Sequence, residues 1–362
     1  MATTNGSSVD ASDEQKEKMP NKVTLYPIFA VADAIDGQPF DPRILPFQIS
    51  AGVAVEDVKP LFTPDTFKWV EGELGRNSVT NLQRIEYAVV HRYAAKDAGE
   101  GSVDDMESDR LVRNVVACLR LIRPMRQRTS LMRGELIDDG KINVQHFEHP
   151  KELLEVPEVQ KLFHLRKTDL DLLRTTADKF LAAMTGEFWK FRMAVDFHEA
   201  GHFQDWYWKA RYSLWCSALE ALFTSQSPEH QGSLVARERI KWFVGESTSI
   251  YGDGDIPSFI RPQPKIAVGT VVDDLYTVRN LIAHGDRVPD DFFERKLRKG
   301  VGEDLSVLQV LLEALSFIIR KSLLRILKDN LLNEFANAAS SEAYFGAAGL
   351  TNTALRATTT KL

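Results

Sequence analysis

The segment EDLSVLQVLLEALSFIIRKSLLRILKDNLLNEFA (303–336) decides the fold class of the C-terminal half of this 362-residue chain. Its large apolar residues recur every three or four positions, which is the spacing of one face of an α-helix. So broad an apolar stripe is stable only where other helices cover it, and the segment therefore predicts a helical bundle. The stripe consists of Leu308, Leu312, Leu315, Ile319, Leu323, Ile326 and Leu331.

The same helical periodicity runs through most of the chain from about residue 166 onward. A loop rich in Pro, Gly and Asp at 246–268 interrupts it. Because successive amphipathic helices joined by short loops pack against one another, we expect one bundle over this region. The further helices are expected at 168–183, 203–224, 234–244 and 270–283.

Strand-forming residues occur near the other end of the chain. The runs VTLYPIFAV (23–31) and ILPFQISAGVAV (44–55) are rich in β-branched and aromatic residues and favour strands. Pro46 marks an edge strand or the entry to a strand, since proline cannot donate to a central ladder. After these two runs we expect helices at 79–95 and 106–123 and a tight turn at Asp138-Asp139-Gly140.

These patterns predict a mainly α protein in which a smaller mixed α/β (α+β) region precedes a helical bundle. A chain of this length exceeds one ordinary core of about 250–300 residues, so we place a boundary near residue 165. Polar composition at one end and Ala, Ser and Thr at the other predict loose tails. The expected regions are a disordered tail at 1–21, a mixed region at 22–165, a helical domain at 166–338 and a loose tail at 339–362.

Composition excludes several classes of protein. The net charge of −6 excludes one that coats nucleic acid or membrane through its total charge, although local basic patches remain. No apolar run reaches the length of a membrane span, and the N-terminus carries no secretory signal, so we expect no membrane association and a cytoplasmic location. Two cysteines are too few for a disulfide framework.

The most specific motif is Arg279-Asn280-Leu281-Ile282-Ala283-His284-Gly285. An arginine and a histidine at this spacing occur often by chance, but an asparagine directly after the arginine and a glycine directly after the histidine make the pattern rare. Histidine can act as acid or base near neutral pH, and the planar guanidinium of arginine can grip two phosphate oxygens. The combination predicts a polar site for phosphate chemistry.

Together with the helix LWCSALEALF (214–223), this motif resembles the Apea-like branch of the HEPN superfamily over about residues 190–335. The resemblance implies a compact helical bundle that pairs into a homodimer and, in many members, cleaves RNA without a metal or other cofactor. It assigns catalytic roles to Arg279, Asn280 and His284. Many relatives are inactive binding modules, and members often work in toxin–antitoxin or antiviral defence systems. A non-catalytic dimerisation or RNA-binding module is therefore the alternative.

A scaffold role for the same residues remains open. On a continuous helix Arg279 and His284 would lie about 140° apart, so they would not converge within one chain. Gly285 suits the left-handed position after a helix, so we expect the helix to end at His284 and a second copy to complete the site. Arg279 could instead pair with Glu220 or Asp274, and Glu220, in an otherwise apolar helix, needs Arg279 or another arginine as a partner.

A competing motif, His198-Glu199-Ala200-Gly201-His202, matches the zinc protease pattern H-E-x-x-H. Its two histidines would bind zinc from one helix face while the glutamate polarises a water. Asp196 and Gln204 depart from the residue types that usually flank the pattern, and Trp208 stands where one zincin class has a third histidine. A zinc metalloprotease is the minor alternative, and we otherwise expect no metal.

Basic clusters give candidate RNA contacts on the N-terminal side and after the motif. A solvated helix face paired with nearby acids is the alternative explanation. Aromatic residues on the expected helix 203–224 suit packing better than base stacking. The N-terminal region would bind a regulatory partner or restrain the nuclease. The candidate RNA-binding residues are Arg120, Arg123, Arg126, Arg128, Arg295 and Arg298.

Overall fold

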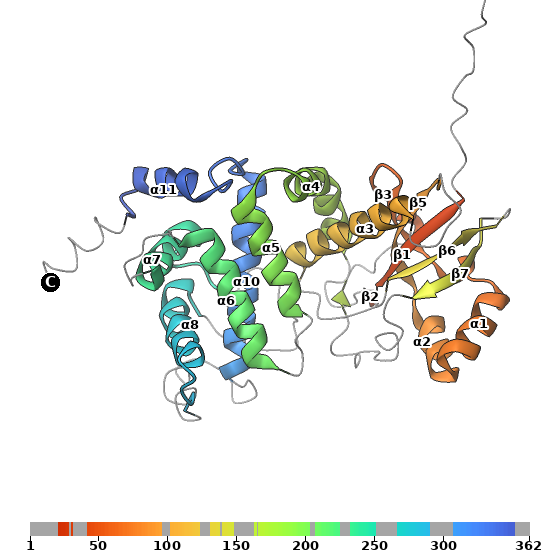
Figure 1. Ribbon diagram of the computed structural model, residues 1–362, viewed down its shortest axis with the longest axis horizontal. Coiled ribbons are helices and arrows are strands. Elements are labelled where there is room, and N and C mark those ends of the chain that lie inside the picture. The colour runs from red at the N-terminus through yellow and green to blue at the C-terminus, as the bar shows by residue number, and fades with distance from the viewer. Residues whose placement is uncertain are drawn as a thin grey trace, which may run out of the picture.

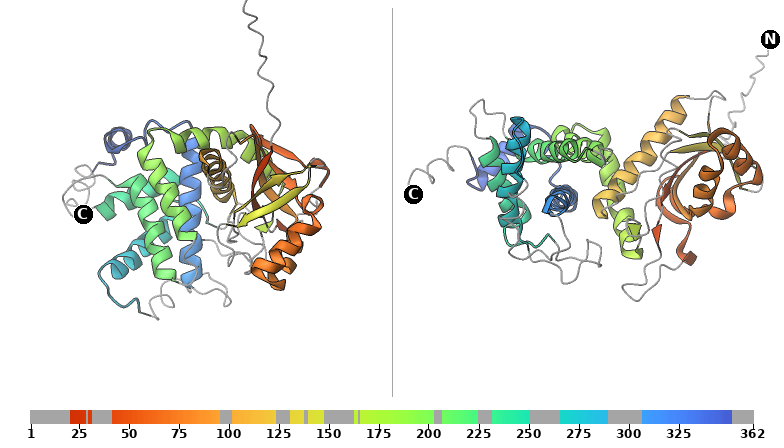
Figure 2. Two further views of the ribbon diagram at one scale, coloured as in Figure 1. Left: turned by 45° about the vertical axis from the view of Figure 1, so that its right-hand side comes forward. Right: turned by 90° about the horizontal axis from the view of Figure 1, so that it is seen from below.

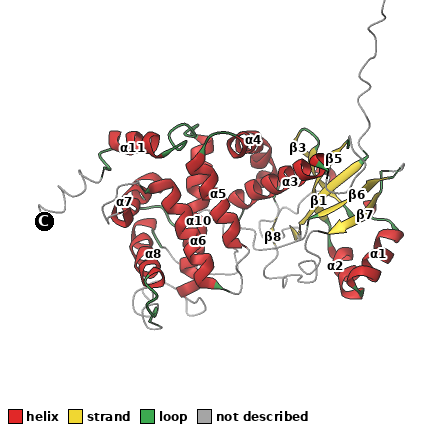
Figure 3. Cartoon of the chain, in the orientation of Figure 1, coloured by secondary structure: helices red, strands yellow, loops and turns green. Residues whose placement is uncertain are grey.

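The computed structural model places a β-sheet at one end of the molecule and a helical bundle at the other (Figures 1 and 3). The chain is mainly α-helical with a mixed α/β N-terminal region, which confirms the fold class expected from the sequence. The structure describes residues 21–28, 30–31, 42–95, 102–123, 131–137, 140–147, 163–164, 166–202, 207–224, 232–250, 266–289 and 307–351.

Six antiparallel strands form the sheet, in the order β3-β4-β5-β1-β6-β7. β1 lies in the middle and pairs with β5 on one side and β6 on the other. β3 follows Pro46 directly and forms one edge, as the proline indicates. The strands are β1 (Lys22–Ile28), β3 (Phe47–Ser50), β4 (Val53–Asp57), β5 (Tyr87–Tyr93), β6 (Met132–Leu136) and β7 (Ile142–Phe147).

Helices cover both faces of this sheet, because alternate residues of β1 are apolar in both directions. Val23 and Leu25 join one core cluster with residues of α1 (Pro64–Leu74) and α2 (Arg76–Arg84). Tyr26 and Ile28 join a second cluster, which contains the apolar face of α3 (Val103–Ile122). Short 3-10 helices at Pro42–Ile44 and Lys59–Leu61 lie in the connections, and β2 (Ala30–Val31) pairs in parallel with β8 (Phe163–His164).

α10 (Val307–Lys328) is the central helix of the bundle (Figure 2). It contacts every helix from α3 to α8, which explains why the 303–336 stripe is so broad. Nearly all its described apolar side chains are buried, and three polar ones, Ser316, Arg320 and Ser322, are buried with them. Its neighbours are α4 (Lys167–Thr185), α5 (Trp189–His202), α6 (Trp208–Phe223), α7 (Gly232–Val244) and α8 (Val268–Ala283).

α3 connects the two halves. It packs on the sheet on one side and against α4 and α10 on the other (Figure 1). One core cluster runs without a break from Tyr26 in the sheet to Phe345 near the C-terminus. Arg320 of α10 adds hydrogen bonds to the last turn of α3, where Nε donates to the Leu121 carbonyl at 3.0 Å. The boundary expected near residue 165 therefore does not separate two independent cores.

Three expected elements differ from the structure. The helix expected at 79–95 ends at Arg84, and β5 takes over the β-branched run that follows. The single strand expected at 44–55 is a hairpin, because Gly52 adopts a positive φ of 73° and reverses the chain. The helix expected at 203–224 begins at Trp208. The hairpin expected around residue 140 is present between β6 and β7, with Gly140 at φ 78°, although Asp138 and Asp139 lie outside the described residues.

The C-terminal segment is packed rather than loose up to residue 351. α11 (Ala338–Ala347) buries Phe345 among aromatic side chains of the bundle. Arg239, fully buried in α7, forms a double hydrogen bond with Glu342 and donates to the Leu350 carbonyl at 3.0 Å. The loose tail expected from residue 339 is therefore wrong for this stretch. Residues 352–362, like residues 1–20 of the tail expected at 1–21, lie outside the described part of the chain, whereas Asn21 is hydrogen-bonded to Tyr93 and Leu136 of the sheet.

Among the described helices, none combines the length and the apolar composition that crossing a lipid bilayer requires.

The ion pair between Arg123 and Asp169 fastens α3 to α4 and supplies a stability test. Arg123 Nε lies 2.8 Å from Asp169 Oδ2, and both side chains are about nine-tenths buried. Asp169→Asn should lower the free energy of unfolding by about 3 kcal/mol, because it leaves a buried guanidinium without its anion. Asp171→Asn is the matched control, since Asp171 pairs with Lys167 at the surface of the same helix and should cost less than about 1 kcal/mol. Urea titration measures both, and equal losses would contradict the assignment.

Candidate functional site

The motif around Arg279 lies where α8 packs against α6. Arg279 Nη2 is 2.9 Å from Glu220 Oε1, and Arg279 Nη1 donates to Asn280 Oδ1 at 3.2 Å. Glu220 thus finds Arg279 as the cationic partner that its apolar helix requires. The Arg279 side chain stays 33% exposed and that of Glu220 23%, so solvent and a ligand can reach the outer side of the pair.

The inner side of this ion pair is closed and of low polarity. Cys216 and Tyr276 are buried there, and burial raises the pKa of both groups, with the negative charge of Glu220 adding to the effect. The Tyr276 hydroxyl has no hydrogen-bond partner among the described residues. Water screens a charge pair less beside such a low-polarity surface than in open solvent. The Glu220–Arg279 pair therefore still stabilises the contact between α6 and α8, although both side chains are partly exposed.

His284 follows the last residue of α8 and is exposed. Gly285, at φ 75°, takes the left-handed position after the helix, as the sequence predicts. Two backbone hydrogen bonds close this end in the Schellman pattern: Gly285 donates to Ile282 at 3.1 Å and Asp286 donates to Leu281 at 2.8 Å. The helix end is therefore fixed by backbone contacts, which leaves the imidazole available to a ligand.

The structure gathers some of the predicted site residues and separates others. Glu220, Arg279 and Asn280 form one hydrogen-bonded cluster. Among the described residues, no hydrogen bond or ion pair joins His284 to it. Five residues along a helix span about 7.5 Å and about 140°, so His284 leaves the helix end in a different direction from Arg279. Within one chain the two groups are therefore not directed at each other.

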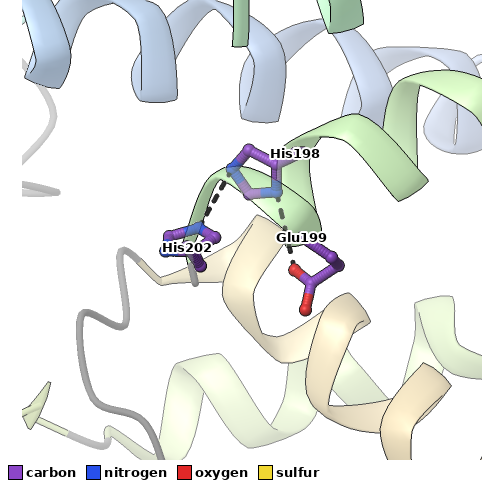
Figure 4. Close-up of side chains that lie close together, drawn as sticks. All are labelled: His198, Glu199 and His202. Carbon is purple, nitrogen blue, oxygen red and sulfur yellow. Dashed lines mark hydrogen bonds and ion pairs between the residues drawn. The ribbon is translucent and has the colours of Figure 1, made fainter. Parts of the chain in front are cut away.

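The HEAGH motif forms a second cluster, in the last turns of α5 (Figure 4). The Nε2 atoms of His198 and His202 lie 3.3 Å apart, and Glu199 Oε1 lies 3.6 Å from His198 Nδ1. One ligand atom from each residue lies within 4.8 Å of the others, so the three groups could hold a metal ion. The helical spacing of the motif is thus realised as the sequence predicts.

The surroundings of this cluster do not suit a protease. His198 is fully buried and His202 is 8% exposed, which leaves no room for a peptide. Glu199 forms an ion pair with the buried Arg120, whose Nη2 also donates to the Tyr26 hydroxyl at 2.7 Å. Burial disfavours the charged form of Glu199 and by itself would raise the pKa of this carboxyl. The opposing contributions, of which the positive charge of Arg120 is the largest, outweigh burial and hold the pKa of Glu199 below its ordinary value. A carboxylate held in this way is not free to activate water.

Gly201 of the motif serves packing between α5 and α6. A side chain there would place its Cβ 2.3 Å from Trp215 Nε1, and the same indole nitrogen donates to the His198 carbonyl at 3.0 Å. α6 therefore packs closely along α5.

Two candidate RNA contacts are buried instead. Arg120 pairs with Glu199 and Arg123 with Asp169, and both arginines are less than 10% exposed. Their acidic partners lie 79 and 46 residues away, so only the tertiary structure reveals them. Tyr212 and Trp215 are buried core residues, as the packing interpretation predicts. Arg126, Arg128, Arg295 and Arg298 lie outside the described residues.

Comparison of this chain with protein-family models gave no match. Comparisons with curated proteins and with solved structures gave none either. The resemblance to the HEPN superfamily therefore depends on the two sequence blocks at 214–223 and 279–285, which the Glu220–Arg279 ion pair brings together.

The left-handed conformation of Gly285 at the end of α8, directly after His284, can be tested by substitution. Gly285→Ala should destabilise the protein by about 1 kcal/mol, because alanine is strained at a positive φ, while among the described residues no atom beyond the chain neighbours lies within 4 Å of the added methyl. Gly72→Ala in α1 is the matched control, since Gly72 is helical with equal space around it and should gain about 0.5–1 kcal/mol. Chemical denaturation measures both, and a gain at Gly285 would contradict the Schellman closure.

Proposed function

We propose that this chain is a metal-independent endoribonuclease of the HEPN type that acts as a homodimer. The observation that carries the proposal is the cluster of Glu220, Arg279 and Asn280 at the surface between α6 and α8, with the exposed His284 at the end of the same helix. A purely structural ion pair would explain Arg279 and Glu220. It would not account for His284, which is exposed at the end of the same helix and has no hydrogen bond or ion pair among the described residues.

The chemistry follows from these side chains. The 2′-oxygen of RNA attacks the adjacent phosphorus, the P–O5′ bond breaks, and a 2′,3′-cyclic phosphate and a 5′-hydroxyl result. A base takes the proton of the 2′-hydroxyl, and an acid gives a proton to O5′. His284 serves as one of these groups, Arg279 stabilises the charge that grows on the phosphate, and Asn280 orients Arg279 through the hydrogen bond they share.

A second copy of the chain supplies what one copy lacks. One histidine cannot act as base and acid in the same step, and His284 points away from Arg279 within one chain. Two helix ends brought together would place two histidines and two arginines around one phosphate. The homodimer is in this proposal part of the catalytic site.

A toxin-like or antiviral effector in the cytoplasm is the cellular role that fits this activity best. Such an enzyme needs restraint, and a regulatory partner acting on the N-terminal sheet is a natural source. α3 connects that sheet to α10, the central helix of the bundle, and so offers a physical route between them.

A non-catalytic RNA-binding or dimerisation module is the second candidate. It is favoured by the ion pair itself, because Glu220 neutralises Arg279 and competes with a phosphate for it. In that case RNA binds, no cleavage occurs, and His284→Ala leaves binding unchanged.

Cleavage of a labelled mixed RNA in EDTA tests the nuclease. The parent protein should cut and leave 2′,3′-cyclic or 3′-phosphate ends. His284→Ala and Arg279→Ala should each lower the rate by at least about 100-fold, which is the usual contribution of a general acid or base. His146→Ala is the control, since that histidine lies on β7 in the sheet and should leave the rate unchanged.

Cleavage that needs a divalent metal, or that survives in both site variants, would contradict the nuclease proposal. A folded, dimeric parent that binds RNA without cutting it would support the binding module instead. Size-exclusion chromatography with light scattering gives the oligomeric state for the same samples.

Glu220→Gln separates the charge of Glu220 from its shape. Glutamine still accepts a hydrogen bond but no longer neutralises Arg279, so RNA affinity should rise about two- to five-fold, which corresponds to about 0.4–1 kcal/mol. Asp329→Asn removes one negative charge from an exposed pair with Arg325 elsewhere on the bundle and controls for total charge. Fluorescence anisotropy with a short RNA measures both, and equal effects would show that Glu220 does not act on Arg279.

A further inference from the structure

We propose that His198 and His202 form a buried binding site for a late first-row transition-metal cation, with Zn²⁺ as the reference ion. The site is structural, lies apart from the Arg279 cluster and does not depend on the proposed nuclease function. It holds the end of α5 at the place where α3, α6 and α10 meet.

The distance between the two imidazoles matches the geometry of zinc. Zn–N bonds of about 2.0–2.1 Å in a tetrahedral arrangement separate neighbouring nitrogens by about 3.3–3.4 Å. The Nε2 atoms of His198 and His202 share a hydrogen bond at 3.3 Å, so a metal ion would take the place of the shared proton, and the rings stand nearly perpendicular at 88°. The i, i+4 spacing on α5 produces this approach, so a metal needs no rearrangement of the helix.

A carboxylate orients the first ligand. His198 Nδ1 and Glu199 Oε1 are both buried, neither has a hydrogen bond, and they face each other at 3.6 Å (Figure 4). A metal on Nε2 requires the proton of His198 to reside on Nδ1, from which it is directed at Glu199. Carboxylate–histidine–metal arrangements of this kind fix the tautomer of the ligand in many metal sites. Arg120 in turn fixes Glu199 through its own ion pair.

The charges around the site select the class of metal. Both imidazoles are buried, and the groups around them are mostly cationic. Glu199 is the acidic group facing them from α5, and Arg120, Arg211 and Arg320 face them from α3, α6 and α10. Mg²⁺ and Ca²⁺ need several carboxylates and are disfavoured here. Late transition metals bind neutral imidazole strongly.

Two features reduce the effect of the nearby positive charges. Glu199 neutralises Arg120 through their ion pair, while Arg211 Nε and Arg320 donate to backbone carbonyls, of Gly201 at 3.2 Å and of α3. His202 is also the last residue of α5, where the negative end of the helix dipole favours a cation. Trp215 packs against both rings and excludes bulk water from one side, so the bound ion serves structure rather than hydrolysis.

Zinc content and thermal unfolding of the full chain test the site. The parent protein is stripped with a chelator, equilibrated with Zn²⁺ and freed of excess ion by gel filtration. It should retain about one zinc per chain and unfold at a higher temperature than the stripped form, whereas Mg²⁺ should cause no shift. His198→Asn and His202→Asn should each lose the zinc and the shift. His284→Asn, at the exposed end of α8, should keep both.

X-ray absorption of the zinc-loaded parent keeps the test valid if the variants fail to fold. The scattering pattern of two imidazole ligands supports the site. A parent that retains no zinc, a spectrum with oxygen ligands alone, or a His198→Asn protein that retains as much zinc as the parent would overturn it. RNA cleavage in EDTA reports on the nuclease proposal separately, because that reaction uses no metal.

Discussion

Burial of α10 is the constraint on which the rest of the structure depends. Most of its described apolar side chains are buried, on more than one side of the helix, so exposing them to water would carry a large cost. Six helices surround it, and one of them, α3, belongs to the N-terminal region. The sheet is thereby fixed to the bundle through a shared core. The same packing sets α6 and α8 side by side against α10, and the Glu220–Arg279 pair forms on the surface that results.

Local patterns predicted much of this fold. The helices of the bundle follow from the period of their apolar residues, and the end of α8 follows from Gly285. The failures occur where two periods compete. Leu82 and Ile85 fit a helix with Val89, but the run AVVHRY in β5 is stabilised by pairing with β1 and β4, which local spacing cannot reveal. The sequence also predicted that Glu220 pairs with an arginine, because a carboxylate in an otherwise apolar helix needs a cation beside it.

Electrostatic roles could not be assigned from the arginine cluster alone. The positions of Arg120 and Arg123 resemble a phosphate-binding face in sequence, yet both fasten helices through acids that fold next to them from far along the chain. Arg239 and Arg320 are buried in the same way and are satisfied by a carboxylate or by helix-end carbonyls. Arg279 differs because a third of its side chain remains exposed. Partial exposure is what a residue needs to bind a phosphate and still be held in place, and this distinction supports the site at α8 over the N-terminal cluster.

The environment of a motif decides its chemistry, and the histidines of this chain illustrate the point. H-E-x-x-H predicts a protease where the glutamate is free and the metal is open to a substrate. Here Arg120 binds the glutamate and Trp215 covers the rings, so the same five residues retain metal-binding geometry without the base or the cleft that hydrolysis requires. His284 lies in the opposite environment, exposed at a helix end, and no hydrogen bond or ion pair engages it among the described residues. The exposure of His284 leaves its imidazole accessible to a ligand, as its proposed role requires, whereas the burial of His198 and His202 would keep a substrate away from an ion held between them.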